Sequence, residues 1–134
     1  MAKNNKKMIK KEIKNYIDLL YMTPSQINVK ELATLLQENQ GITVEVWEEM
    51  NVIEVELGNE NSVDFELIDK DFKEPSDVSF VRNRNIQTIF AINMCEEDLD
   101  MVSEYFEAIV AKYNGFLCAD SEDFYPVYAG SSKK

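Results

Sequence analysis

Acidic side chains alternate with apolar ones along residues 42–57, ITVEVWEEMNVIEVEL, and again along residues 63–67. Successive side chains of a β-strand point to opposite faces of the sheet, so this period of two predicts one apolar and one acidic face. Clustered carboxylates attract positive charge, so the chemistry expected of this face is the binding of a basic partner. We expect the acidic face to carry Glu45, Trp47, Glu49, Glu54, Glu56, Asp64 and Glu66.

Trp47 is the single tryptophan of the chain and lies within this acidic segment. An exposed tryptophan is a frequent anchor of protein–protein interfaces, which favours a contact role. The alternative is that Trp47 covers the edge of the sheet or lies beneath residues 69–79. Like charges that face each other on neighbouring strands cost stability. Six carboxylates without a lysine therefore indicate a function for this face, unless hydration alone makes them tolerable.

A second group of carboxylates follows two predicted strands. CEEDLD begins at the end of a strand expected over residues 86–94, and ADSED begins at the end of a strand expected over residues 116–119. Parallel strands of a β-α-β unit end at the same edge of a sheet, where ligands often bind. We expect this edge to contact a basic partner through Glu96, Glu97, Asp120, Glu122 and Asp123.

The same carboxylates allow two alternatives, a metal site and a purely structural role. Carboxylate oxygens suit Ca²⁺ or Mg²⁺, although the spacing does not match an EF-hand loop. Acidic residues are also common at helix N-termini and in turns, which would account for Asp98, Asp100 and the sequence DSED by structure alone.

The chain lacks the residues on which most enzyme mechanisms depend. It has no histidine, which removes the commonest general base and the usual catalytic triads, and its two cysteines cannot complete a zinc site. It has no glycine-rich phosphate-binding motif, and its two arginines do not make a nucleic-acid-binding surface. We therefore predict a protein that is not an enzyme and that binds no cofactor or metal.

The net charge of −11 is spread unevenly along the 134 residues. Residues 1–30 carry seven lysines and two acidic residues, whereas residues 31–132 carry a net charge of −18. A field of that sign repels nucleic acid and anionic membranes and attracts basic proteins. The alternative is that the acidity only keeps the protein soluble.

The chain has no run of about 18 apolar residues and no N-terminal segment with the features of a secretory signal. We therefore expect a cytoplasmic protein that makes no membrane contact. In that compartment Cys95 and Cys118 are expected to be reduced thiols in the core. Nearby carboxylates would raise a thiol pKa and so disfavour reactivity, but a redox role is left open.

The first predicted element is an amphipathic helix over residues 8–21, preceded by a disordered basic segment over residues 1–7. Apolar residues recur at helical spacing on one side of this helix, and lysines occupy the other. We expect the lysines to lie against the acidic body of the protein; contact with nucleic acid or a membrane surface is the alternative. The apolar stripe is Ile9, Ile13, Tyr16, Ile17 and Leu20, and the lysines are Lys6, Lys7, Lys10, Lys11 and Lys14.

The remaining elements follow from capping signals and changes of period. Asn28, with Glu31 three residues later, predicts a second helix that ends before Gly41. Three strands of an antiparallel meander follow over the acidic segments. The chain is then expected to form a loop over 69–79, a short strand or extended lead-in over 78–84, a strand over 86–94, a helix over 96–113, a strand over 116–119 and an edge strand or tail over 124–128.

Together these elements predict an α+β fold. Its mixed, mostly antiparallel sheet combines the three-stranded meander with a β-α-β unit over residues 86–119, and helices cover one face. Residues 8–128 are expected to form a single domain, and residues 129–134 a tail.

We expect a small acidic protein that inhibits or neutralises a basic protein, such as a toxin or a nuclease-like enzyme, by presenting carboxylates to its nucleic-acid-binding surface. Bacterial immunity proteins and antitoxins are the class that fits, and the abundance of Lys, Asn and Ile is typical of an AT-rich bacterial genome. One alternative is a subunit or adaptor, including a homodimer, that docks through the helix over residues 8–21. The other is a small metal-dependent enzyme that uses the acidic edge.

Overall fold

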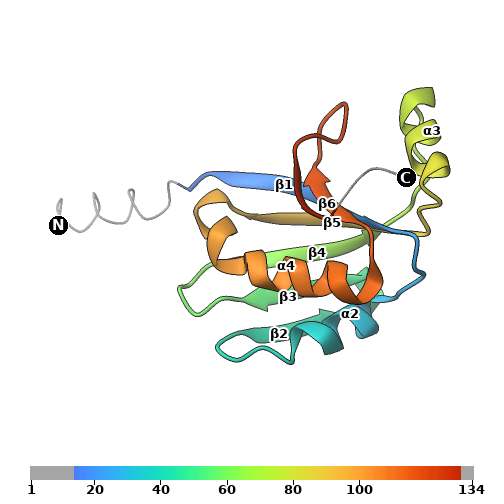
Figure 1. Cartoon of the computed structure of the whole chain (residues 1–134). Coiled ribbons are helices and arrows are strands. Elements are labelled where there is room, and N and C mark those ends of the chain that lie inside the picture. The colour runs from blue at the N-terminus through green and yellow to red at the C-terminus, as the bar shows by residue number, and fades with distance from the viewer. Residues whose placement is uncertain (1–13, 131–134) are drawn as a thin grey trace.

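The computed structural model describes residues 14–130, so the predictions for residues 1–7, for 8–13 of the first helix and for the end of the tail lie outside the described residues. The α+β class is confirmed: three described helices accompany a seven-stranded antiparallel sheet in the order β2-β3-β4-β5-β1-β6-β7 (Figure 1). The strands are β1 (Tyr16–Thr23), β2 (Thr43–Trp47), β3 (Val52–Glu56), β4 (Ser62–Ile68), β5 (Thr88–Cys95), β6 (Phe116–Ala119) and β7 (Val127–Gly130). The helices are α2 (Val29–Leu36), α3 (Pro75–Asn83) and α4 (Leu99–Tyr113), with short 3₁₀ turns η1 (Glu48–Met50) and η2 (Glu96–Asp98).

β1 lies where the sequence predicts the second half of the first helix. It pairs antiparallel with β5 on one side and with β6 on the other. Leu19 and Tyr21 are buried in one apolar core, whereas Leu20 and Met22 are buried in a second core. A strand with neighbours on both edges and apolar layers on both faces needs a continuous apolar run, which resembles a helical stripe. The prediction of a helix over these residues was wrong for that reason.

The second predicted helix, α2, is confirmed together with its cap. Asn28 Oδ1 accepts a hydrogen bond from the Glu31 backbone N–H at 2.9 Å, and Glu31 Oε1 accepts one from the Asn28 N–H at 3.0 Å. This capping box satisfies two of the N–H groups that a helix start leaves unpaired. Leu32 and Leu36 are fully buried, so the apolar stripe of α2 packs against β2 and β3.

The three acidic strands form the predicted meander, β2-β3-β4. Thr43 lies opposite Glu56 and Trp47 lies opposite Val52. The first hairpin closes through η1 and Asn51, whose backbone is left-handed with φ of 57°. Asparagine adopts that conformation more readily than most residues. The apolar side chains of β3 and β4 face the core beneath α2 and α4, which leaves their acidic side chains on the other face.

α3 begins inside the segment 69–79, which the sequence predicts as a loop, and continues through most of the ambiguous segment 78–84. The loop prediction holds for residues 69–74 and was wrong from residue 75 on, and the short strand or extended lead-in was wrong. Pro75 occupies the first helical turn, where a missing N–H costs no hydrogen bond, so it starts the helix and does not break it. The helix is short and buries only Val81, so its apolar period is weak. Phe80 packs against Phe116 and Phe124, with ring centroids 5.9 and 4.6 Å away. These contacts from distant segments hold α3 against the sheet.

The β5-α4-β6 unit is confirmed with one difference. β5 and β6 run parallel to each other, but β1 lies between them, so all hydrogen-bonded neighbours in the sheet are antiparallel. Gly115 lies at the turn from α4 into β6, close to β1. A Cβ at this position would be 2.0 Å from the Met22 carbonyl oxygen, and the φ of +85° also favours glycine.

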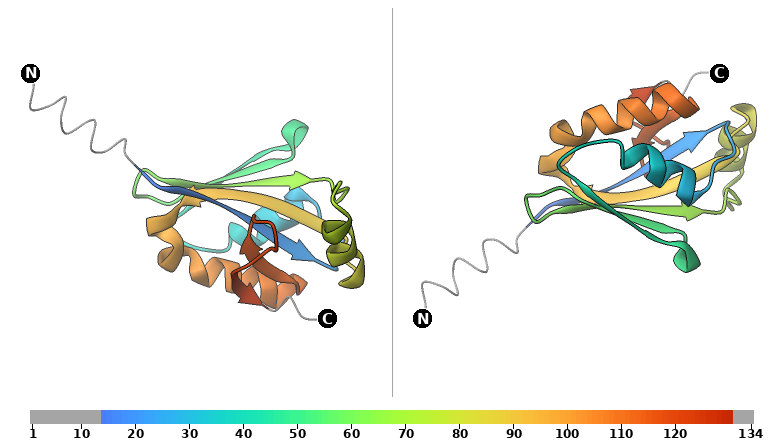
Figure 2. Two further views of the ribbon diagram at one scale, coloured as in Figure 1. Left: turned by 90° about the horizontal axis from the view of Figure 1, so that it is seen from above. Right: turned by 90° about the horizontal axis from the view of Figure 1, so that it is seen from below.

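Two apolar cores lie on opposite faces of the sheet. α2 and α4 cover one face, as Figure 2 shows, and the larger core lies beneath them. The smaller core lies on the other face, where α3 and Phe124 cover parts of β1, β5 and β6. The prediction that helices cover only one face of the sheet was therefore incomplete, because α3 covers part of the other face. Over β2 and β3 this second face carries no helix from residues 14–130 and is open.

β7 forms the edge next to β6 and ends at Gly130, two residues beyond the predicted end of the domain. Pro126 precedes it, and the Tyr125–Pro126 peptide bond is cis. An edge position fits the proline, because its nitrogen cannot donate a ladder hydrogen bond. Among the helices of residues 14–130, none has the length and apolar character needed to cross a membrane.

The burial of β1 on both faces can be tested with adjacent substitutions. Leu19→Ala and Leu20→Ala should each lower the free energy of unfolding by about 2–5 kcal/mol, because each leaves a cavity in a different core. Tyr16→Ala should change it by less than about 1 kcal/mol, since Tyr16 is 59% exposed. Guanidinium unfolding followed by circular dichroism measures all three. Wild-type stability in Leu19→Ala would contradict a strand that is buried on both faces.

Candidate functional site

Acidic side chains from the meander lie in line across the open face of the sheet. Glu45 of β2 lies opposite Glu54 of β3, and Glu54 lies opposite Asp64 of β4. Asp64 in turn lies opposite Asn93 of β5. Directly opposed residues of a sheet share a face, so three consecutive strands present three carboxylates side by side.

The line continues across β1 and past the end of β6. Asn93 lies opposite Asp18 and donates a hydrogen bond from Nδ2 to Asp18 Oδ1 at 2.9 Å. The Asp120 backbone N–H donates to the Asp18 carbonyl at 3.1 Å. Six segments far apart in the chain thus contribute to one transverse line, which we call the acidic row: Glu45, Glu54, Asp64, Asn93, Asp18 and Asp120.

A groove of about 410 Å³ lies beside the row over the middle of the sheet. Asp18, Asp64 and Asp120 of the row line it, with Asn93 between them. The next residues along the strands are less polar: Val52 and Ala91 line the groove together with Glu66. Trp47 lies opposite Val52 and is 48% exposed. The groove therefore offers carboxylates on one side and a partly apolar surface on the other.

Burial, and for Glu54 also neighbouring charge, disfavours the charged form of two carboxyls in the meander. Burial raises the pKa of Glu54, and the charges of Asp64, Glu45 and Glu56 raise it further. Burial also raises the pKa of Asp64, against a smaller lowering by its hydrogen bond with Ser62. A cation placed beside these groups would favour their charged form, because it would offset both causes.

The same holds at the other end of the row. Burial raises the pKa of Asp120, and the charges of Asp18 and Asp77 raise it further. Asp77 belongs to α3, so α3 adds negative charge next to the row as well as covering the smaller core.

One oxygen in the row lacks a partner. Asp64 Oδ1 is buried and accepts no hydrogen bond from the described part of the chain. No strand within residues 14–130 contains a lysine or an arginine, so the strands themselves supply no cation to this face. The ion pair between Lys30 and Glu48, at 3.0 Å, joins α2 to η1 and does not involve the row.

Two further hollows carry the same charge. One, of about 360 Å³, lies at the end of the meander and is lined by Glu54, Glu56 and Glu60. The other, of about 770 Å³, lies between α3 and the segment after β6. Its lining combines the rings of Phe80 and Phe124 with Glu74, Asp77, Glu122 and Asp123. Negative charge thus extends from the open face over β2 and β3 to the hollow beside α3 on the same side of the sheet.

The structure brings together most of the residues predicted for the acidic face. Glu45, Glu54, Glu56, Asp64 and Glu66 lie on one side of the meander with Trp47, as their register requires. Glu49 is the exception, because it lies in η1 beyond the end of β2.

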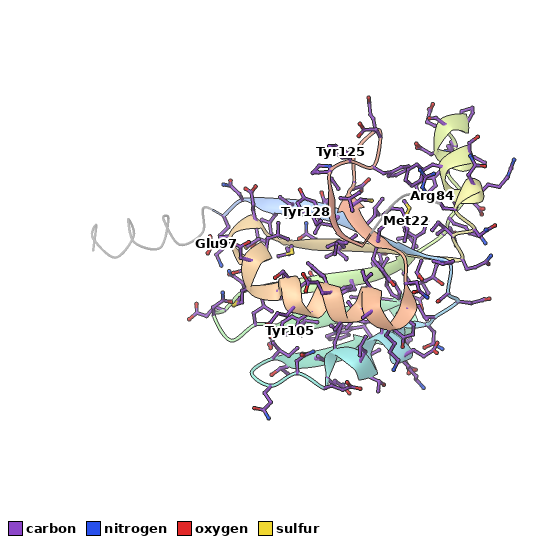
Figure 3. All side chains as sticks on the ribbon, viewed as in Figure 1. Met22, Arg84, Glu97, Tyr105, Tyr125 and Tyr128 are labelled. Carbon is purple, nitrogen blue, oxygen red and sulfur yellow. The ribbon has the colours of Figure 1, made fainter. Side chains whose placement is uncertain are left out.

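The predicted acidic edge is divided. Asp120 joins the row, and Glu122 and Asp123 line the hollow beside α3. Glu96 and Glu97 lie in η2, and Figure 3 shows Glu97 on the turn that leads into α4. β1 separates β5 from β6, so these two glutamates do not meet Asp120. The expectation of a single continuous edge was wrong because a third strand is inserted there.

Asp98 has a structural role. Its side chain is 3% exposed and accepts hydrogen bonds from Asn59 Nδ2 at 3.0 Å and from Asn61 Nδ2 at 2.8 Å. These bonds join the start of α4 to the turn between β3 and β4. For this aspartate the structure therefore supports the structural role and not a metal site.

Asp18, Asn93 and Asp77 are parts of the site that the sequence did not indicate. Asp18 was assigned to a helix, and Asp77 to a loop. Asn93 is one polar residue in a strongly apolar strand. The sequence YIDLLYM did contain a signal: an aspartate directly before a short apolar run that ends at Thr-Pro suits the entry of a buried strand.

The arrangement suits binding more than bond-breaking chemistry. Carboxylate oxygens accept hydrogen bonds from lysine and arginine, which can only donate. Burial, with a further contribution from Asp120, raises the pKa of the buried Cys118 thiol to about 12, so Cys118 is not a thiolate nucleophile at neutral pH. Among residues 14–130, no group of three or more carboxylates and cysteines is placed to hold a metal ion.

Comparison with protein-family models, with curated proteins and with solved structures finds no match for this chain.

The raised pKa values predict how stability depends on pH. In the folded protein Asp64 and Glu54 bind a proton more readily than at their ordinary pKa values of 3.8 and 4.5. The folded state should therefore gain stability from these groups as the pH falls from 7 through their raised pKa values. Asp64→Asn removes a carboxylate that is disfavoured when charged, so it should stabilise the protein at pH 7 and flatten the profile.

Urea unfolding from pH 7 down through the ordinary carboxyl pKa values of 4.5 and 3.8 measures this effect. Glu107→Gln is the matched control, because Glu107 is exposed on α4 and faces away from the row. Profiles of the same slope for wild type and Asp64→Asn would contradict a buried Asp64 carboxylate that is disfavoured when charged.

Proposed function

We propose that this chain is a small, non-enzymatic binding protein that neutralises a basic protein by covering part of its surface with the acidic row and the flanking groove. The observation that carries the proposal is the row itself. Within residues 14–130, five carboxylates and one amide cross the sheet, one carboxylate oxygen is buried without a hydrogen-bond partner, and no strand supplies a lysine or arginine.

The energetics favour a partner with lysine and arginine side chains. Like charges placed side by side raise the free energy of the unbound protein, so an incoming cation gains more here than at an isolated carboxylate. The net charge of −11 adds to this effect, because its electric field steers basic proteins toward the surface over long distances. Affinity for such a partner should therefore fall steeply with salt.

Trp47 supplies a contact of a different kind. It is half-exposed at the edge of the acidic face, opposite Val52. An arginine or lysine placed over its ring would gain a cation–π interaction while a neighbouring cation meets Glu45 or Glu66. A tryptophan ringed by carboxylates has the composition of an interface anchor for a basic surface.

The class of protein that this proposal favours is the immunity or antitoxin type. Such a protein places carboxylates where a nuclease-like toxin binds the phosphates of nucleic acid, and so blocks that surface. The width of the row supports this class, because its five carboxylates lie in a line from β2 to the end of β6, as the charges of a phosphate backbone do. The adaptor alternative loses support, since residues 16–21 of its docking helix belong to β1, an inner strand of the sheet.

Charge reversal at the centre of the row tests the proposal. Glu54→Lys should weaken capture of a basic protein at low salt by at least about tenfold, because it repels the partner's cations and pairs internally with Glu45 and Asp64. Glu107→Lys changes the net charge equally but lies on α4, on the opposite side of the sheet, and should bind as wild type.

The measurement is capture from a lysate of the organism that encodes the chain, at low and high salt, followed by assay of the captured protein. A single basic protein should be retained by wild type and by Glu107→Lys, released by salt, and inhibited when the chain is added back. Equal loss of binding in the two variants would mean that net charge alone is responsible. Capture by neither variant nor wild type would refute the proposal.

A further inference from the structure

β2 is the last strand on one side of the sheet, and no strand among the described residues pairs with its outer edge. Unpaired strand edges can accept an additional strand, and proteins that avoid this place lysine or proline there or cover the edge. β2, with the sequence TVEVW, has neither residue. Figure 1 shows it at the margin of the sheet, with no further strand beyond it.

The register identifies which backbone groups point outward. Leu57 N–H donates to the Asn61 carbonyl at 3.0 Å, and Leu67 N–H donates to the Asn51 carbonyl at 2.9 Å. Hydrogen-bonded pairs alternate along antiparallel strands, so Asn51, Ile53, Val55 and Leu57 direct their backbone groups to β4. Val52, Glu54 and Glu56 therefore direct theirs to β2.

The same alternation settles the orientation of β2. Thr43, Glu45 and Trp47 lie opposite the residues of β3 that point toward β2, so they use their N–H and C=O groups in that ladder. Val44 and Val46 must then point away from β3. Two N–H groups and two C=O groups at the free edge thus lack a strand partner within residues 14–130.

The side chains beside this edge define what an added strand must carry. Val44 and Val46 are half-buried on the helix side, where they pack against the larger core. Glu45 and Trp47 lie on the open side and belong to or flank the acidic row. An added strand would place apolar side chains next to the two valines and basic side chains next to Glu45 and Trp47.

A second copy of this chain fits the edge poorly. Antiparallel pairing of β2 with itself about its centre would place Glu45 directly opposite the same glutamate of the other copy, and opposed like charges cost stability. Lysine or arginine at that position would instead form an ion pair. Glu45 lies between the hydrogen-bonded pairs at this edge, where opposed residues of an antiparallel ladder approach most closely. The short distance strengthens both the repulsion between two glutamates and the attraction between Glu45 and a lysine or arginine.

We propose that the basic partner binds by adding an extended segment of alternating apolar and basic residues to the free edge of β2, so that its cations continue the line of the acidic row. This inference rests on the proposed function and specifies the partner: a strand whose main chain pairs with Val44 and Val46 and whose alternate side chains meet Glu45 and Trp47.

The probe is a blocked eight-residue peptide of alternating valine and lysine, titrated into the full chain while the emission of Trp47, the only tryptophan, is followed. The valine N–H groups of the peptide should point toward β2, and its lysine N–H groups should point away. N-methylation of the valine amides should therefore weaken binding about tenfold or more, whereas N-methylation of the lysine amides should not.

The matched change in the protein is Val46→Pro, which removes an outward N–H without removing a β2–β3 hydrogen bond and is tolerated at a strand edge. It should weaken binding as strongly as valine methylation does, whereas Glu107→Gln, on the exposed side of α4, should bind as wild type. A peptide of alternating valine and glutamate should not bind. If Val46→Pro fails to fold, the two methylated peptides decide the question on the unchanged protein.

Three results would overturn strand addition. Salt-sensitive binding that neither Val46→Pro nor valine methylation weakens would mean that the open face alone holds the cations, and the proposed function would stand. No binding of the valine–lysine peptide at low salt would remove the inference, and the capture experiment with Glu54→Lys would judge the function separately. A dimer in sedimentation that Val46→Pro dissociates would assign the edge to a second copy.

Discussion

The position of β1 is the constraint on which the rest of the structure depends. It pairs antiparallel with β5 and with β6, so it joins the meander side of the sheet to the β6–β7 side. Its alternate side chains enter the two apolar cores on opposite faces of the sheet, so β1 is buried on both faces. Gly115 permits the close approach, since any side chain there would collide with the backbone of β1. Asp18, at the open start of the strand, then lies between the carboxylates of β4 and the end of β6.

The acidic row is a consequence of this sheet order and has an energetic cost. Opposed carboxylates on neighbouring strands repel each other. Burial raises the pKa of Glu54, Asp64 and Asp120, and the charges of neighbouring carboxylates raise the pKa of Glu54 and Asp120 further. The two cores and the cap of α2 supply the stability that makes the cost tolerable. A basic partner would remove part of the repulsion on binding. The fold thus tolerates a surface whose free energy is higher in the unbound protein than in a complex with a basic partner.

The open face and the free edge of β2 are complementary parts of one surface. Side chains on the face offer charge, and the backbone at Val44 and Val46 offers directional hydrogen bonds. Charge gives long-range attraction and salt sensitivity, whereas backbone pairing fixes register and orientation. Trp47 lies where the two meet, with nearly half of its surface exposed. A partner that used both would be selected by its sequence pattern as well as by its charge.

The sequence alone determined the elements whose signals are local. The capping box of Asn28 and Glu31, the period of two in the meander and the apolar stripe of α4 each depend on neighbours within a few residues, so α2, β2–β4 and α4 followed from the pattern. For the same reason the acidic face of the meander followed from Glu45, Glu54 and Asp64. Only the tertiary structure decided that residues 16–21 form a strand, since burial on both faces is a property of its neighbours β5 and β6. It also decided that α3 is a helix, because aromatic contacts from Phe116 and Phe124 hold it in place. Finally, it decided that Asp18 and Asp120 join the row, because pairing between distant strands leaves no periodic pattern in the sequence.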